Sequence, residues 1–222
     1  MTLLDFPGKV ACTVFLAGCD LRCPFCHNSD LIDGAAPTVM DDTALLAFLQ
    51  KRKGLLDGVA FTGGEPLLRR ELKELIVKIC NLGFAVKLDT NGTHPERLRE
   101  LLEERLVDYV AMDIKNSPAR YGETVGVADI DLAPIRESAK LLMESGVPYE
   151  FRTTVVAELH DDASFEAIGE WLPNAERFFL QRFTDRDSVL FSGLHAPEKA
   201  DMERFAAILR RKMPFVELRG VD

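Results

Sequence analysis

The sequence predicts an α/β fold in which parallel strands alternate with helices. Six short apolar or β-branched runs recur along the chain of 222 residues, and stretches with helical spacing lie between and after them. The runs do not alternate between apolar and polar residues, which is typical of strands buried on both faces of a parallel sheet. Two forms remain open, a doubly wound open sheet and a complete or partial barrel. Six units are fewer than the eight of a closed barrel, so a curled sheet would be a partial barrel with an open side.

The predicted strands are short segments rich in Val, Phe and Tyr. In chain order they cover residues 10–16, 58–61, 84–88, 108–112, 149–156 and 177–181. Arg152 stands in the middle of the fifth segment, where an interior-facing arginine is costly unless it is paired. We therefore expect Arg152 to meet an anionic ligand or a partner carboxylate. Gln181 on the sixth segment is a weaker candidate, with core packing as the alternative.

Six segments place apolar residues at helical spacing, and residues that start or stop helices flank several of them. The stripes are Leu45, Phe48 and Leu49; Leu68, Leu72, Leu75, Ile76 and Ile79; Leu98, Leu101 and Leu102; Ile135, Ala139 and Leu142; Phe165, Ile168 and Trp171; and Met202, Phe205 and Leu209. Asp41 and Asp42 are capping candidates before the first stripe, and Pro95 suits the first turn of the third. Gly146 is a predicted stop after the fourth stripe, and Pro214 follows the last.

Composition and charge exclude several classes of protein. Apolar content is even and no long linker or repeat interrupts the chain, so we expect a single domain over residues 1–222. The net charge of -9 repels a phosphate backbone, which argues against a nucleic-acid partner. No leader pattern is present and no stretch approaches the ~20 apolar residues of a membrane span. The five cysteines do not form a disulfide framework, so we expect a reducing, cytoplasmic location.

Chemically distinctive residues follow each of the first four predicted strands. They are AGCDLRCPFCHN (17–28), TGGEP (62–66), DTNG (89–92) and DIKN (113–116). In either parallel architecture, the loops after the strands converge on one face, where ligands bind. The sequence therefore predicts a single site built from four loops.

The first loop carries three cysteines, Cys19, Cys23 and Cys26, at spacings of four and three. Thiolates in such a pattern bind soft metals. Structural zinc takes four ligands, and His27 is a poor fourth because it adjoins Cys26. A 4Fe-4S cluster held by three cysteines leaves one iron free for a small molecule. The pattern favours the iron–sulfur cluster, with zinc as the alternative.

Five other potential metal ligands lie apart from these motifs. Cys12 and Cys80 are isolated and are expected to pack as small apolar side chains, so we expect no second cluster. His94, His160 and His195 are scattered, and surface or capping roles are expected for them.

The second loop combines two glycines with a carboxylate. Gly63 and Gly64 permit positive φ and close backbone approach, and Glu65 follows them at the end of a strand. This arrangement suggests a backbone edge and one carboxylate aimed at an ammonium group. An ordinary tight turn is the alternative.

The third and fourth loops each begin with an aspartate. Asp89, with Asn91 and Gly92, could simply form a turn, and Asp113 could cap a helix. Because both aspartates lie beside the predicted thiolate site, and Lys115 follows the second, we expect polar ligand contacts. A small monovalent cation shared by the two carboxylates is part of this expectation.

Together these motifs resemble those of the radical S-adenosylmethionine enzymes, in which an aromatic residue such as Phe25 precedes the last cysteine. More narrowly, LLDFPGKVACTVFLAGCDLRCPFCHN, TGGEPLL, DTNG and MDIK resemble segments of glycyl-radical-enzyme activases, and among them the anaerobic ribonucleoside-triphosphate reductase activating proteins. The resemblance runs from about residue 3 to 156 and its motifs are highly specific. Residues beyond 160 carry little of it.

The resemblance implies a partial (β/α)6 barrel and a role for each motif. Cys19, Cys23 and Cys26 would ligate the cluster, and S-adenosylmethionine would chelate the open iron through its amino and carboxylate groups. The remaining cofactor-binding residues would be Phe25 near adenine, Gly63, Gly64 and Glu65 at the methionine ammonium group, and Asp89, Asp113, Lys115 and Arg152 at the rest of the cofactor or a nearby cation. Asp5 would touch the glycine loop of the partner, with a turn before Pro7 as the alternative.

The implied reaction is glycyl-radical formation. One electron from the reduced cluster would split the cofactor into methionine and a 5'-deoxyadenosyl radical, which abstracts hydrogen from a glycine Cα of a partner, anaerobic ribonucleotide reductase. A flavodoxin-like or ferredoxin-like protein would donate the electron. The alternatives are a pyruvate formate-lyase type activase, a radical enzyme that makes a deazapurine precursor, and a zinc-stabilised binding module.

Overall fold

The computed structural model describes residues 2–221. Seven strands form one parallel sheet in the order of the chain. They are β1 (Ala11–Leu16), β2 (Gly58–Gly63), β3 (Ala85–Thr90), β4 (Tyr109–Asp113), β5 (Tyr149–Val155), β6 (Phe178–Arg182) and β7 (Val216–Arg219). Within residues 2–221 the sheet does not close from β7 back to β1, so the fold is a partial barrel with an open side.

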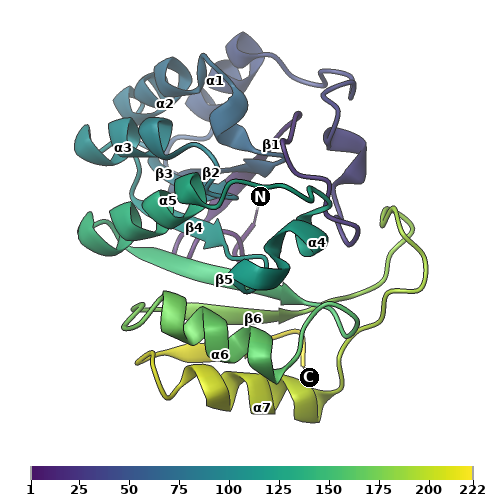
Figure 1. The fold of residues 1–222 in the computed structure, drawn as a ribbon. Helices are drawn as coiled ribbons and strands as arrows, with labels where there is room; N and C mark the ends of the chain where they lie inside the picture. The colour runs from purple at the N-terminus through teal and green to yellow at the C-terminus, as the bar shows by residue number, and fades with distance from the viewer. Residues whose placement is uncertain (1, 222) are drawn as a thin grey trace.

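The helices follow the strands around the outside of the sheet, from α1 at the top of Figure 1 to α7 at the bottom. They are α1 (Asp42–Gln50), α2 (Leu72–Asn81), α3 (Pro95–Glu103), α4 (Tyr121–Val125), α5 (Ala133–Glu144), α6 (Asp162–Trp171) and α7 (Lys199–Leu209). Asp41 caps α1, since its side chain accepts a hydrogen bond from the Ala44 N–H at 2.8 Å. None of the helices in residues 2–221 is long and apolar enough to cross a bilayer.

All six predicted strands are confirmed, and the structure adds β7 and the short helix α4. One helical prediction is wrong. The sequence predicts Leu68 in the apolar stripe of the second helix, but Leu68 lies in a separate 3-10 turn, Pro66–Leu68, ahead of α2. The turn and the helix are separate because Arg69 has an extended backbone, with ψ of 118°.

The amino-terminal end of the barrel is closed by a small apolar cluster of its own. Phe6 packs there with Ala11 and Tyr109, and its side chain is 2% exposed. Gly58 provides the space, because a Cβ at that position would lie 2.9 Å from Cε1 of Phe6. The segment before β1 thus forms the floor of the barrel, and the opposite end is left for the loops that carry the predicted site.

Strand β7 is tied to the barrel interior by an ion pair. Nη1 and Nη2 of Arg219 each donate to the Glu150 carboxylate at 2.9 Å, and the guanidinium lies 3.5 Å from the ring centroid of Phe179. Phe179 belongs to β6 and Glu150 to β5, so the contact spans three neighbouring strands.

Candidate functional site

A cavity of about 230 Å³ lies at the carboxyl ends of the strands. Its walls come from the loop after β1 and from the ends of β2 to β6. Ten of the predicted site residues line it: Cys19, Cys23, Phe25, Cys26, Gly63, Gly64, Asp89, Asp113, Lys115 and Arg152. The weaker candidate Gln181 also lines it, whereas Glu65 does not. The topology therefore brings loops together that lie far apart in the sequence.

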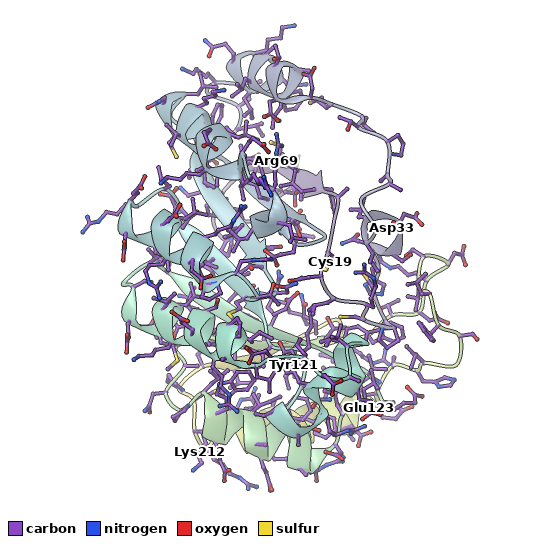
Figure 2. All side chains as sticks on the ribbon, turned by 45° about the horizontal axis from the view of Figure 1, so that its top comes forward. Cys19, Asp33, Arg69, Tyr121, Glu123 and Lys212 are labelled. Atoms are coloured by element: carbon purple, nitrogen blue, oxygen red, sulfur yellow. The ribbon has the colours of Figure 1, made fainter. Side chains whose placement is uncertain are left out.

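The cysteine loop is held in place by its own backbone. The N–H groups of Gly18 and Cys19 donate to the carbonyls of Leu31 and Ile32, at 2.7 and 2.8 Å. The Arg22 guanidinium donates to the Cys19 carbonyl at 2.6 Å. Figure 2 shows Cys19 on this loop near the centre of the molecule, with Asp33 on the part of the chain that returns past it. All three cysteines of the loop are free thiols.

The two glycines of the second loop lie directly against the cysteine loop. A Cβ at Gly64 would stand 2.0 Å from the Gly18 carbonyl oxygen, and one at Gly63 would stand 2.5 Å from the Leu16 oxygen. The Gly64 and Glu65 N–H groups donate to Leu16 and Gly18, both at 2.8 Å. The close approach that the sequence predicted is therefore made to the cysteine loop's own backbone. We call these main-chain contacts of Gly64 and Glu65 with Leu16 and Gly18 the glycine interlock.

The Glu65 carboxylate does not face the cavity. It is 1% exposed and accepts hydrogen bonds from the Leu67 N–H at 3.0 Å, the Thr90 hydroxyl at 2.9 Å and the Asn91 N–H at 2.6 Å. Burial raises its pKa to about 7. Both carboxylate oxygens accept hydrogen bonds, so Glu65 links the second and third loops. The sequence predicts instead a carboxylate aimed at an ammonium group.

Arg152 bridges the two predicted aspartates. Its Nε donates to Asp113 at 2.9 Å and its Nη1 to Asp89 at 3.3 Å. Lys115 adds a second cation, with its Nζ 2.8 Å from Asp113, and Lys87 adds a third on Asp89. The predicted partner carboxylate of Arg152 is confirmed. The cation that Asp89 and Asp113 share in this structure is the guanidinium group.

The charged groups of this network are strongly coupled. Burial alone would raise the pKa of Asp113, but Arg152 and Lys115 hold it well below its usual range. Burial alone would lower the pKa of Lys115, but Asp113 raises it well above its usual range. The network therefore presents fixed charges to the cavity at neutral pH.

Cys23 is the most buried of the three cysteines in this loop. Burial raises the pKa of Cys23 to about 12, although the Lys115 charge opposes the shift. Such a thiol is protonated at neutral pH unless a metal or another positive group stabilises the thiolate.

The histidines differ in their surroundings. His27 lines the cavity with the three thiols, but its Nε2 lies 2.7 Å from the Thr184 carbonyl and its ring stacks on Phe183. His195 is exposed and pairs with Glu158 at 2.6 Å, as expected for a surface residue. The surface or capping role predicted for His160 is wrong, because it is 5% exposed and contacts the Lys115 carbonyl at 2.9 Å. His94 precedes α3 but makes no capping bond.

Cys12 is buried in β1, and Cys80 lies in α2, where its thiol contacts the Leu106 carbonyl at 3.6 Å. Neither lines the cavity. Asp5 accepts a hydrogen bond from the Thr13 hydroxyl at 2.6 Å, and a turn at Pro7 follows it, with the Lys9 N–H bonded to the Phe6 carbonyl.

Residues 13–172 match the family model of the Radical SAM superfamily. The chain belongs to this superfamily. A protein of Methanocaldococcus jannaschii, named as a glycyl-radical enzyme activating enzyme, is 30% identical over 234 residues, which cover 100% of this chain and 94% of the relative. The pyruvate formate-lyase 1-activating enzyme of Escherichia coli is 28% identical, over 94% of this chain and 91% of its own.

Other radical SAM relatives match less of the chain or only its fold. The 7-carboxy-7-deazaguanine synthase of Thermococcus kodakarensis is 28% identical over 68% of this chain and 66% of its own. The crystal structure of Streptococcus suis SuiB bound to S-adenosylmethionine superposes with a TM-score of 0.73 at 16% identity. The match covers 97% of this chain and 51% of that one, so this chain spans about half the length of SuiB. At this identity the likeness concerns the radical SAM fold alone.

Membership of the radical SAM superfamily implies a 4Fe-4S cluster and S-adenosylmethionine. The donor set fits the cluster, since three free thiols of one loop line one cavity. Within residues 2–221, no three His, Cys, Asp or Glu side chains converge tightly enough to hold a single metal ion, as structural zinc would require. A cluster does not need that convergence, because each cysteine binds a different iron.

Two residues at this radical SAM site were not predicted from the sequence. Lys87 is 2% exposed and pairs with Asp89, and the sequence predicts Asn91 only as a turn former. Alternation along β3 could have found Lys87, because it lies two residues before Asp89 and so faces the same side of the sheet. No sequence pattern indicated where the Asn91 amide points.

Proposed function

We propose that this chain is a radical SAM activase. It reductively cleaves S-adenosylmethionine at a 4Fe-4S cluster and uses the 5'-deoxyadenosyl radical to generate a glycyl radical on a partner enzyme. The observation that carries the proposal is the cavity, which three free thiols line and which no other cysteine of residues 2–221 reaches. Two relatives named as activating enzymes, each matched over more than nine tenths of this chain, support the activase assignment.

In this proposal Cys19, Cys23 and Cys26 would hold the cluster, which would supply the one low-potential electron that cleaves the cofactor. The protein binds and orients the cofactor and excludes water from it. Phe25 and the backbone of Gly63 and Gly64 would contact it, since all three residues line the same cavity. Glu65 would act indirectly, by fixing the loops on which these contacts depend.

The charged network would bind the polar remainder of S-adenosylmethionine. Lys115 and Arg152 face the cavity as fixed cations and suit the carboxylate and hydroxyl groups of the cofactor. A monovalent cation would occupy Asp89 and Asp113 only if Arg152 moved away on cofactor binding, because its guanidinium already bridges the two carboxylates.

We propose anaerobic ribonucleoside-triphosphate reductase as the partner, because the motif segments resemble those of its activating proteins. Pyruvate formate-lyase is the second candidate, favoured by the 28% identity to its activating enzyme. Asp5 would contact the partner's glycine loop. The electron would come from a flavodoxin-like or ferredoxin-like donor, and the whole chain would act as one domain in a reducing cytoplasm.

The test is to mix the reconstituted, reduced protein and S-adenosylmethionine with each candidate partner under anaerobic conditions. We expect a glycyl radical signal by electron paramagnetic resonance with one partner, and loss of that signal when the partner's glycine is replaced by alanine. Cofactor cleavage without a glycyl signal from any partner would favour a small-molecule enzyme, such as one of the deazaguanine synthase type. Uptake of zinc without iron would contradict the enzyme proposal.

A further inference from the structure

The amide side chain of Asn91 lies between the third loop and the cysteine loop. Its Nδ2 donates to Oδ1 of Asp20 at 2.8 Å and lies 3.9 Å from Sγ of Cys19, within the range of a weak hydrogen bond to sulfur. Asn91 is 6% exposed, so little water competes for these contacts. Asn91, which itself lines the cavity, therefore contacts one of the three thiols there.

The direction in which the amide points is fixed by its other end. Oδ1 of Asn91 accepts a hydrogen bond from the Thr93 N–H at 3.0 Å and another from the Thr93 hydroxyl at 2.7 Å. An N–H donor can bond only to the oxygen end of an amide, so the NH₂ group must be the end that faces Cys19. One of its two hydrogens suits Asp20 and the other suits the sulfur.

The backbone of Asn91 is fixed as firmly as its side chain. Its N–H donates to the buried Glu65 carboxylate at 2.6 Å. The adjacent Gly92 is held by Ser138, whose hydroxyl donates to the Gly92 carbonyl at 2.7 Å. The amide therefore has a defined distance to Cys19 and does not depend on a flexible loop.

We infer that Asn91 is a positioning residue that acts through Cys19 and raises the reduction potential of the cluster. The inference rests on the proposed function, in which Cys19 is a cluster ligand. Hydrogen bonds to cysteine sulfur stabilise the more negative, reduced form of an iron–sulfur cluster. Asp20 acts in the opposite direction, since its carboxylate takes one hydrogen of the same amide and places negative charge beside the first cysteine.

The test is the midpoint potential of the reconstituted protein, measured by a redox titration followed by electron paramagnetic resonance. In Asn91→Leu we expect a more negative midpoint potential. At the wild-type midpoint, the ratio of reduced to oxidised cluster should be about tenfold smaller than in the wild type, which corresponds to a shift of about 59 mV for one electron. In Asp20→Asn we expect a shift in the positive direction. That variant keeps the bonds of Asn91 to Thr93 and Glu65, so it tests the inference even if Asn91→Leu takes up little iron.

Ser138→Ala is the matched control, because it removes a buried hydrogen bond to the same turn without touching Cys19. We expect its midpoint to equal that of the wild type. An equal negative shift in Ser138→Ala would show that loosening of the turn is responsible and would overturn the inference, as would unchanged midpoints in Asn91→Leu and Asp20→Asn.

The measurement uses neither S-adenosylmethionine nor a partner enzyme, so the two proposals can fail separately. Opposite shifts in the two variants without a glycyl signal from any partner would support the role of Asn91 and contradict the activase function. A glycyl signal from the wild type, with midpoint potentials in Asn91→Leu and Asp20→Asn equal to that of the wild type, would support the activase function and contradict the role of Asn91.

Discussion

The carboxylate of Glu65 links protonation to folding. Its pKa rises from 4.5 in the ordinary state to about 7 because the group is buried, despite three hydrogen-bond donors. The unfolded chain therefore loses this proton at a lower pH than the folded chain does. The contribution of the protonated carboxyl group to the free energy of unfolding is fully present below pH 4.5 and is lost as the pH rises through about 7.

We expect Glu65→Gln to remove this pH dependence. Between about pH 5 and pH 8, the free energy of unfolding of the wild type should fall relative to that of Glu65→Gln, by at most about 3 kcal/mol. Urea unfolding at several pH values measures the difference. Glu103→Gln, at an exposed position at the end of α3, is the control, and an equal relative change in that variant would contradict the assignment to Glu65.

The five cysteines divide into two groups with different expected effects. Replacing Cys19, Cys23 or Cys26 with alanine should abolish cofactor cleavage and lower iron content, because each would leave one iron without a protein ligand. Cys12→Ala and Cys80→Ala should keep both, since neither residue lines the cavity. Iron analysis and a cleavage assay on the purified variants check this. Full cleavage in any variant of the first group would contradict the ligand assignment.

Among the loops, the glycine interlock has a purely steric origin at Gly64. Its φ is not in the left-handed region, and a Cβ would lie 2.0 Å from the Gly18 oxygen. We expect Gly64→Ala to destabilise the protein by about 1–3 kcal/mol and to reduce iron uptake, because the cysteine loop must move.

Gly83→Ala is the control for Gly64→Ala. Gly83 has φ of 90° and open space around it, so alanine there costs about 1–2 kcal/mol of backbone strain and should leave iron uptake unchanged. Thermal unfolding and iron analysis compare the two variants. Equal iron uptake in both would mean that the interlock does not position the cysteines.

The strands were predictable where they are buried on both faces, because apolar residues then fill consecutive positions. Strand β7 was missed because it has four residues and only part of it is buried, so the run is too short to stand out. Glu150 was overlooked although it lies two residues before Arg152 in the same predicted strand. Its partner Arg219 lies on β7, and no local pattern could reveal that pair.

At the scale of the whole molecule, the amino-terminal segment closes one end of the barrel through Phe6. We expect Phe6→Ala to lower the free energy of unfolding by about 3–5 kcal/mol, because a large ring 2% exposed would leave a cavity among Ala11, Gly58 and Tyr109. Urea unfolding measures the loss. Leu4→Ala is the control, since Leu4 is 92% exposed and should change stability by less than about 0.5 kcal/mol. Similar losses in both variants would contradict the floor role.

The position of the site was predictable from topology, because parallel strands bring the loops at their carboxyl ends to one face. The orientation of individual side chains was not. Glu65 turns away from the cavity because buried N–H groups of two loops need an acceptor, and Arg152 lies between Asp89 and Asp113 because they neutralise its charge. Both outcomes depend on contacts between segments that are distant in the sequence.

The glycine interlock also bears on how the protein responds to oxygen. It consists of main-chain atoms of Leu16, Gly18, Gly64 and Glu65, and none of these atoms is a metal ligand. Loss of an iron–sulfur cluster to oxygen would therefore leave the interlock itself intact. We expect fresh iron and sulfide to restore the cluster without unfolding of the chain.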